Sequence, residues 1–457
     1  MKKKISLNYG CALKKVVGKE GISKKELQKF SSTFKKGLFS LSQKRTKKII
    51  GFADLPYEKK LCEKIIKKAQ QLRGHYDCMV VLGIGGSALG TSAVLEAIKG
   101  SFFNHKPGGE REGWLKVIVA DNISPDFISE IFDLIPFERT CFSVITKSGT
   151  TSETISTFAH ALNLAKRRFG GDWKRRFVFI TDPEKGFLRE LARKEKVESF
   201  EIPPNVGGRY SVLTPVGLFP LACAGVNIRK LLEGAASFDR VCFEKNLFKN
   251  PAGIFASIHY LLYKKGKRIN VFMPYVEKLK TLSDWFAQLW AESLGKQKNT
   301  YGKDIFIGPT PVKAKGVTDQ HSQLQLYTEG PFDKVITFIT CQKFENDIKI
   351  PEIGKFEFSK KSFFKLLKAE ETGTMFSLLK AGRPFLEISL HKVDEFYIGQ
   401  IIFMLEVATA LWGEFANLNA FNQPGVEFGK IIAKKILVND RKVLGNLKKL
   451  KLKEYSV

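Results

Sequence analysis

The sequence has few of the residue patterns that hold metals or disulfides. Its six histidines form no H-x-H or H-x-x-x-H pair, and its seven cysteines form no C-x-x-C pair. A histidine metal site is therefore not expected. An odd number of cysteines, most of them in apolar runs, predicts core thiols in a reducing, cytoplasmic setting. The cysteines are Cys11, Cys62, Cys78, Cys141, Cys223, Cys242 and Cys341.

Long uninterrupted apolar runs are also missing. The longest, Ile401–Trp412, contains Glu406 and is too short to cross a bilayer. The N-terminus is basic but has no continuous apolar segment, so it does not resemble a signal peptide. We therefore expect a globular chain with no membrane partner.

Acidic residues are scarce relative to basic ones. Lys and Arg number 75 against 46 Asp and Glu, a formal net charge of +29 in 457 residues. Such a bias suggests a polyanionic partner. The lysines, however, are scattered through helical segments and are not interleaved with aromatic residues in one arm. We expect no nucleic acid as the main partner, although the charge favours a small phosphorylated anion.

Apolar runs alternate with amphipathic helical segments, which predicts an α/β fold with doubly wound, mainly parallel sheets. A Pro/Gly-rich joint at 202–220 separates two such halves. The predicted strands are 79–82, 115–120, 141–145 and 177–180, then 268–273 and 335–341. The predicted helices include 56–73, 125–134, 153–169, 281–294, 397–412 and 422–438. The predicted domains are an N-terminal arm (1–50), two α/β domains (51–204 and 205–420) and a C-terminal helical segment (421–457).

A glycine-rich turn follows the first strand. Glycines at 83, 85, 86 and 90 surround Ser87, and a helix follows directly. Such a turn lets backbone N–H groups and a helix N-terminus face a phosphate. No Lys-Ser/Thr follows the glycines, so the turn is not a P-loop. Asp121 ends the next predicted strand, so a nucleotide site stays possible. A tight strand-to-helix turn that binds no ligand is the other alternative.

A second turn, rich in hydroxyls, follows the strand at 141–145. Thr146, Lys147, Ser148 and Thr151 combine hydroxyl donors with one positive charge. Turns of this kind often only cap the next helix. Because the same α/β unit already carries the glycine turn, we expect both turns to face one phosphate monoester.

Two motifs in the second half suggest proton-transfer chemistry. Gln288 and Glu292 lie four residues apart, on one face of an aromatic-rich helix, and Glu292 could act as a base. The alternative is a surface ion pair between Glu292 and Lys296. Arg209 follows two glycines at the joint and could stabilise an oxyanion, or form an interdomain salt bridge.

The remaining candidates lie in polar segments. His321 is surrounded by glutamines and hydroxyls and could move a proton, although a lone histidine is usually structural. Gln423 and Lys430 lie near the start of the last predicted helix and could reach a ligand. Lys430 could equally be one more surface lysine.

Five motifs, in order, resemble those of the glucose-6-phosphate isomerase (phosphoglucose isomerase) family in its compact bacterial form, from about residue 45 to 437. They are GIGGSALG, TKSGTTSET, VGGRYSVLTPVG, ESLGK with DQHSQLQLYTEGP, and NQPGVEFGK. The resemblance implies two sugar-isomerase-type (SIS) domains. It also implies roles by position. Gly86, Ser87, Thr146, Lys147, Ser148 and Thr151 would bind the substrate phosphate, and Gln288 and Gln423 would contact the substrate.

The resemblance further implies a mechanism. Glu292 would be the base, Arg209 would stabilise the cis-enediolate, and His321 with Lys430 would open the ring. Glucose 6-phosphate and fructose 6-phosphate would be interconverted in glycolysis and gluconeogenesis, without a metal or an organic cofactor. A homodimer with shared active sites is implied, in which His321 serves the partner's site.

Two departures from the family pattern stand near this site. Thr146 stands where serine is common, and Asn422 where aspartate is common. Two rival interpretations remain open: a non-catalytic sugar-phosphate sensor, and an enzyme acting on another sugar phosphate such as an amino sugar. The glutamine-dependent version of the latter is not expected, because Lys2 and not cysteine follows Met1.

Overall fold

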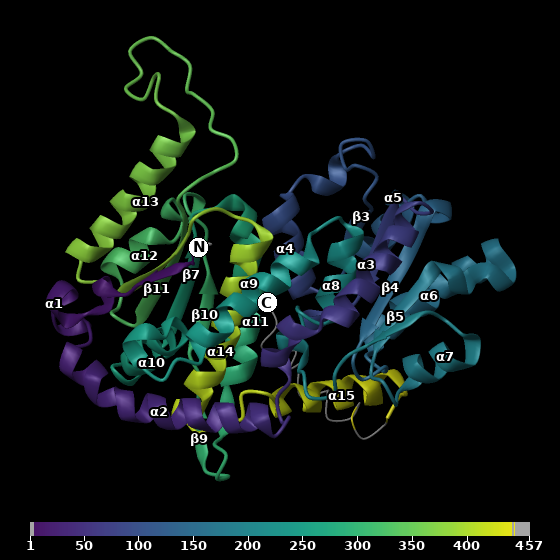
Figure 1. Cartoon of the computed structure of the whole chain (residues 1–457), viewed down its shortest axis with the longest axis horizontal. Helices are drawn as coiled ribbons and strands as arrows, with labels where there is room; N and C mark the ends of the chain where they lie inside the picture. Colours follow the sequence, from purple (N-terminus) through teal and green to yellow (C-terminus); the bar gives the residue numbers. More distant parts are fainter. Residues whose placement is uncertain (1–3, 441–442, 444–457) are drawn as a thin grey trace, which may run out of the picture.

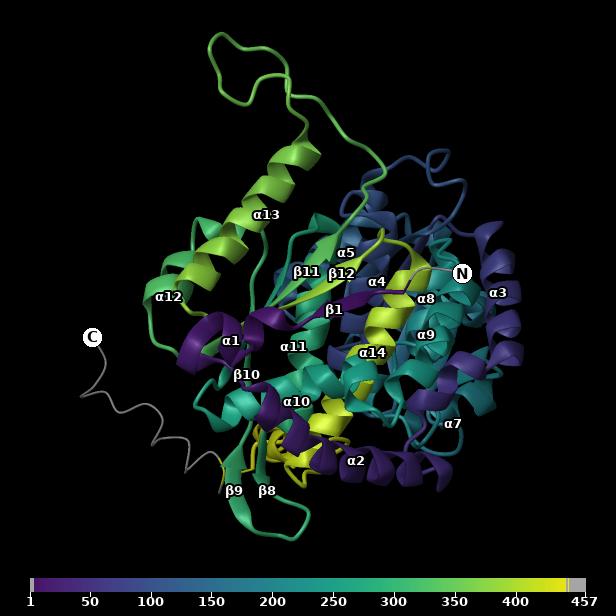
Figure 2. The same ribbon diagram turned by 60° about the vertical axis from the view of Figure 1, so that its left-hand side comes forward.

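The computed structural model describes residues 4–440 and 443, and it is organised around two separate sheets (Figures 1 and 2). The first sheet contains β2 (Cys78–Leu82), β3 (Lys116–Ala120), β4 (Thr140–Thr146), β5 (Phe177–Thr181) and β6 (Ser199–Glu201). All its pairings are parallel, in the order β3-β2-β4-β5-β6. The predicted α/β class and the four predicted strands of this half are confirmed.

Both faces of this sheet are covered, as a parallel sheet requires. Alternate residues of β2 point to different cores: Met79 and Val81 to a large one, Val80 and Leu82 to a smaller one. The large core includes α3 (Lys59–Arg73), α4 (Leu89–Lys99) and α8 (Pro215–Cys223). The smaller core is closed by α5 (Pro125–Leu134), α6 (Ser152–Phe169) and α7 (Phe187–Glu195).

The order of the strands predicts a ligand site beyond the ends of β2 and β4. The chain moves from β2 to β3 on one side, then crosses to β4 on the other side of β2. In open parallel sheets, ligands bind where the strand order reverses in this way, beyond the carboxyl ends of the strands. The glycine-rich turn after β2 and the hydroxyl turn after β4 therefore both border this predicted site.

The second sheet has the order β1-β12-β11-β7-β10. Its strands are β1 (Ser6–Asn8), β7 (Ile269–Pro274), β10 (Thr310–Lys313), β11 (Lys334–Cys341) and β12 (Phe385–Leu390). Every pairing is parallel except β1 with β12. One face packs on α12 (Leu324–Glu329) and α13 (Phe363–Lys380), and the other on α11 (Lys280–Leu294). A separate hairpin joins β8 (Lys296–Lys298) to β9 (Asp304–Ile307).

The N-terminal segment adds a strand to the second sheet and a helix that packs on its neighbours. Its strand β1 pairs with the edge strand β12. After α1 (Lys14–Val17), the long helix α2 (Lys24–Thr46) packs on α10 (Pro251–Lys264) and on α14 (Glu395–Phe415). Three-residue strands such as β1 have too little alternation to be found from sequence. The predicted domain boundaries at 50, 204 and 420 stay predictions.

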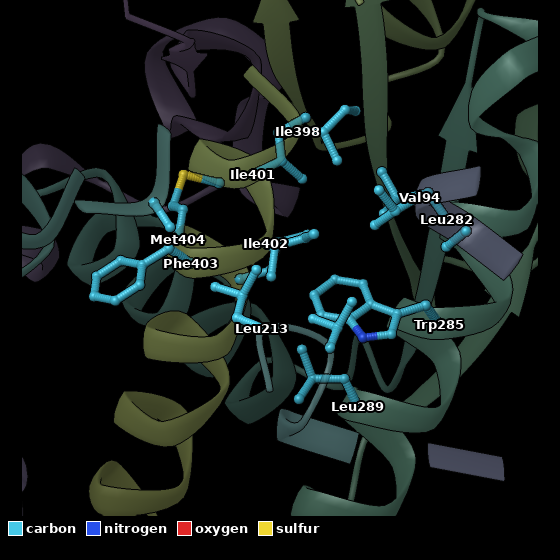
Figure 3. Close-up of a cluster of buried hydrophobic side chains, with 14 of the residues drawn as sticks. Val94, Leu213, Leu282, Trp285, Leu289, Ile398, Ile401, Ile402, Phe403 and Met404 are labelled. Carbon is cyan, nitrogen blue, oxygen red and sulfur yellow. The ribbon is translucent and has the colours of Figure 1, made fainter. Parts of the chain in front are cut away.

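Helix α14 forms the centre of the molecule. It passes the length and hydropathy test for a membrane span, yet its apolar window is buried throughout. Its neighbours include α2, α9 (Ile228–Cys242), α10 and α11. Figure 3 shows Ile402 of α14 facing Leu213 and, on α11, Trp285 and Leu289. This helix is apolar on every side because it is surrounded by protein.

The last described helix, α15 (Glu427–Leu437), begins five residues later than predicted. A short 3-10 turn at 424–426 precedes it, because Pro424 and Gly425 interrupt the backbone. None of its residues is buried, and it runs below the first sheet in Figure 1. The predicted C-terminal segment beyond residue 440, apart from Val443, lies outside the described residues.

Candidate active site

The glycine-rich turn is in direct contact with the turn that carries Arg209. Gly85 has φ +57°, a conformation that favours glycine. A Cβ on Gly86 would lie 2.3 Å from the carbonyl carbon of Gly208, so only glycine allows this approach. The Ser211 hydroxyl also donates to the Gly86 carbonyl at 3.4 Å. The backbone of the turn with Ser87 is thereby fixed against residues 208–211.

The hydroxyl turn forms a compact cluster of donors. The Thr146 and Thr151 hydroxyls lie 2.8 Å apart, and the Ser148 hydroxyl is 3.4 Å from each. The backbone N–H of Thr150 donates to the Ser148 hydroxyl at 3.2 Å. Of the four predicted phosphate-binding residues of this turn, Thr146, Ser148 and Thr151 have their hydroxyls together, whereas the Lys147 ammonium contacts other groups.

The Lys147 ammonium lies at the joint between the two halves. It donates to the carbonyls of Pro204 and Val206, at 2.7 and 2.8 Å. Burial lowers the pKa of this lysine, which Asp182 partly offsets. In the described part of the chain, two backbone carbonyls, and no carboxylate, therefore hold the positive charge of Lys147 beside the first sheet.

Arg209 is the most constrained side chain of the site. It is 3% exposed, and every nitrogen of its guanidinium is used. Nε donates to the Ser293 hydroxyl at 2.7 Å, and Nη2 to the carbonyls of Ala420 and Asn422, at 2.5 and 3.1 Å. Nη1 faces the two groups expected to meet substrate: Gln423 Oε1 at 2.9 Å and Glu292 Oε2 at 3.3 Å.

Glu292 lies in the last turn of α11, between Arg209 and Gln288. Gln288 Nε2 donates to Glu292 Oε1 at 3.3 Å, as their spacing on one helical face predicts. The Glu292 side chain is 34% exposed, whereas that of Arg209 is 2% exposed. The carboxylate is thus oriented by two neighbours and still open to a ligand.

The structure therefore places four predicted residues in one cluster: Arg209, Gln288, Glu292 and Gln423. Gly86 joins it through Gly208, and Gly85 through Gln288, whose Nε2 lies 3.0 Å from the position of a Cβ on Gly85. The arrangement combines a carboxylate that can take a proton, a fixed cation beside it and two adjacent turns suited to a phosphate. It is the geometry expected for proton transfer on a phosphorylated molecule.

No hydrogen bond or ion pair within residues 4–440 joins His321 or Lys430 to this cluster. His321 is exposed and follows the 3-10 turn at 318–320, before α12. Helix α12 lies beside α13 at the left of both Figure 1 and Figure 2, whereas α4 and α8 lie to the right. Lys430 is also exposed, and its ammonium pairs with Glu427 on the same helix at 3.1 Å.

A separate cavity of about 500 Å³ lies at the other end of α4. Its lining includes Lys99, Arg111, Glu112, Glu277 and Glu345, and none of the predicted site residues. Acidic and basic side chains are balanced there. The predicted chemistry is concentrated instead around Arg209. Among the described residues, no group of three His, Cys, Asp or Glu side chains could hold a metal ion.

Comparison with known proteins identifies the family of this chain. A profile of the phosphoglucose isomerase family matches residues 58–446. The chain belongs to this family. A glucose-6-phosphate isomerase of Carboxydothermus hydrogenoformans is 44% identical over 419 residues, covering 90% of each chain. One of Methanocaldococcus jannaschii is 36% identical, covering 95% of this chain and 99% of that relative.

A solved structure shares the fold as well as the sequence. A hypothetical protein from Thermus thermophilus superimposes with a TM-score of 0.83 at 32% identity, over 95% of this chain and 99% of that one. The resemblance stated from the five motifs is therefore confirmed for the phosphoglucose isomerase family. The role of each site residue stays a prediction.

The sequence did not indicate every residue of this candidate site. Ser293 and Tyr210 lie behind Arg209, with their hydroxyls 3.3 Å apart. Lys296 was weighed only as a surface partner of the Glu292 carboxylate. Instead it is buried, and its ammonium donates to the backbone carbonyl of Glu292. The i, i+4 spacing allows Lys296 to bind either the carboxylate or the backbone carbonyl of Glu292. Only the burial of the helix end distinguishes the two contacts.

Proposed function

We propose that this protein interconverts glucose 6-phosphate and fructose 6-phosphate, as a glucose-6-phosphate isomerase. One observation carries the proposal. Arg209 Nη1 contacts both Glu292 and Gln423, while the backbone of its turn touches the glycine turn after β2. A base, an oxyanion stabiliser and a phosphate cradle thus meet beyond the ends of β2 and β4.

The phosphate of the substrate binds between the two turns of the first sheet. Ser87 and the hydroxyls of Thr146, Ser148 and Thr151 donate to its oxygens, and Lys147 supplies charge. The contacts of these hydroxyls with one another, at 2.8 to 3.4 Å, support this role because a phosphate oxygen can replace them. Binding at C6 fixes the position of C1 and C2 near Glu292.

Isomerisation then needs one proton carrier. Glu292 removes the proton from C2 of the open-chain aldose and returns it to C1, through a cis-enediolate, while the hydroxyl proton of O2 passes to O1. Arg209 stabilises the negative charge on the enediolate oxygens, since its orientation is already fixed by Ser293 and two carbonyls. Gln288 and Gln423 contact the sugar from either side of the carboxylate.

Ring opening requires His321, which we assign to the partner subunit of a homodimer. Its exposed position apart from Arg209 supports this assignment. Helix α15 supports the dimer, because Phe428, Ile431 and Leu437 are 72%, 53% and 78% exposed in the single chain. Such a group of apolar side chains on one helix is typical of an interface. Assembly also places Lys430 where it can assist His321.

The reaction belongs to glycolysis and gluconeogenesis, in the cytoplasm. All seven cysteines are free and six are buried, which supports a reducing compartment. The deciding experiment measures fructose 6-phosphate formed from glucose 6-phosphate in the presence of EDTA. Turnover under these conditions supports the proposal. Binding of either sugar phosphate without turnover would instead favour a sensor.

A further inference from the structure

Lys296 occupies an unusual position for a lysine. It is the second residue after the end of α11 at Leu294, and it is only 7% exposed. Its ammonium donates to the carbonyl of Glu292 at 2.5 Å and to the carbonyl of Asn422 at 2.9 Å. One side chain therefore joins the helix end that carries Glu292 to the segment that carries Gln423.

The first of these contacts has a clear physical origin. The last carbonyls of a helix have no partner within the helix, and cations near the C-terminus are favoured by the helix dipole. The ammonium satisfies the carbonyl of Glu292 itself. It therefore fixes the backbone from which the carboxylate projects.

The second contact is shared with another cation. Asn422 O accepts from Lys296 and also from Arg209 Nη2, at 3.1 Å. Arg209 and Glu292 are the charged groups that act on Lys296. Burial and the Arg209 charge lower the pKa of Lys296 to about 8, and Glu292 offsets part of this. Two buried cations that share one carbonyl cost desolvation free energy and repel each other. This cost argues for a role of Lys296 beyond stability.

We propose that Lys296 is a positioning residue for the isomerisation: its ammonium holds the Glu292 end of α11 and the Asn422–Gln423 segment at the separation that the reaction needs. This inference rests on the proposed function. Arg209 also links these two segments, but on α11 it contacts the side chains of Ser293 and Glu292. Lys296 differs because it binds the backbone carbonyl of Glu292 itself. The effect is on catalysis more than on binding, since Lys296 has no contact with the two phosphate-binding turns.

The test compares Lys296→Met with Lys298→Met. Lys298 is on the same strand, but its side chain is 58% exposed and 3.9 Å from Asp304. We expect kcat of Lys296→Met to fall by about tenfold to a hundredfold, the effect of a small misplacement of reacting groups. KM should stay within about threefold. Lys298→Met should match the wild type.

The pH profile separates positioning from simple structural support. In the wild type, kcat should decline above about pH 8 as Lys296 loses its charge. Lys296→Met should lack this step, and Lys296→Arg, which stays charged, should recover activity and move the decline to higher pH. If Lys296→Met does not fold, the wild type and Lys296→Arg profiles decide the question.

Two results would overturn the inference. One is a Lys296→Met enzyme with wild-type kcat and an unchanged alkaline limb. The other is a loss of activity that only follows the loss of folded protein, measured by circular dichroism. The wild type and Lys298→Met test the isomerase activity itself. A failure of the proposed function would therefore show in those two proteins, and a failure of the Lys296 role only in the Lys296 variants.

Discussion

Glu292 is the residue on which the proposed chemistry depends most directly. Glu292→Gln keeps the side-chain shape and can still contact Arg209 and Gln288, so substrate binding should survive. We expect kcat to fall by about a hundredfold or more, because general base catalysis is worth roughly 10²–10⁴. The measurement is kcat together with exchange of the C2 proton with solvent. Near-normal isomerisation by Glu292→Gln would exclude Glu292 as the base.

The phosphate cradle should show itself in KM. Combining Ser87→Ala with Lys147→Ala removes one hydroxyl and the charge at the joint, and should raise KM for glucose 6-phosphate. Lys174→Ala is the matched control, because this exposed lysine precedes β5 at the opposite edge of the sheet. Free glucose should be a very poor substrate of the wild type, since binding of the phosphate drives chemistry at C1 and C2. Equal turnover of glucose would contradict the cradle.

Single residues were predictable where a local motif carries the chemistry. The glycines around Ser87 and the spacing of Gln288 and Glu292 can be interpreted without a structure. The partners of Arg209 could not be predicted, because three of its contacts lie more than 200 residues away, at 420, 422 and 423. Those partners are mostly backbone carbonyls, which leave no signal in the side-chain sequence.

Helix α14 carries one buried carboxylic acid, Glu406, with no hydrogen-bond partner among the described residues. Its side chain is fully buried, and the missing partner applies to both carboxylate oxygens. Burial raises its pKa well above the ordinary value. A raised pKa means that Glu406 keeps its proton in the folded state at pH values where it has lost it in the unfolded state. The free energy of unfolding therefore falls as the pH rises above the pKa of the unfolded state, near 4.5.

Glu406→Gln should therefore stabilise the protein, and the gain should grow between pH 5 and pH 8. Glutamine does not titrate, whereas the buried carboxylic acid destabilises the folded protein increasingly as the pH rises above 4.5. The measurement is the free energy of unfolding by urea at both pH values. Glu414→Gln is the control on the same helix, because Glu414 forms an ion pair with Lys44 and its loss should destabilise. An equal effect of Glu406→Gln at both pH values would contradict a protonated Glu406.

Some long helices were predicted well, whereas α9, α10 and α13 were not predicted and only the first residues of α2 were. The limits of α5 agree with its predicted range, and α11 differs from its own by one residue, because apolar periodicity and Pro125 mark them. Strands β1, β6, β8, β9, β10 and β12 were not predicted. All but β12 have three or four residues, and β1 is a strand only because β12 offers an open edge. Pairing between distant segments decides such strands.

At the scale of the whole molecule, the proposed site would be completed by a second copy of the chain. Arg209, Gln288, Glu292 and Gln423 meet, whereas His321 is exposed in a segment before α12. Helix α15 carries Lys430 and an uncovered apolar face. A second copy of the chain can cover this face and supply the histidine. The net charge of +29 does not oppose assembly strongly, because separated surface charges are screened at physiological salt.

Mixed dimers test this assembly directly. Arg209→Ala and His321→Ala should each be nearly inactive, since every site of either homodimer lacks one group. If each site takes Arg209 from one chain and His321 from the other, a mixed dimer has one site with both defects and one with neither. Mixing the two variants under subunit exchange should then restore part of the wild-type activity, with mass spectrometry confirming the exchange. No recovery despite exchange would mean that both residues serve one site from the same chain.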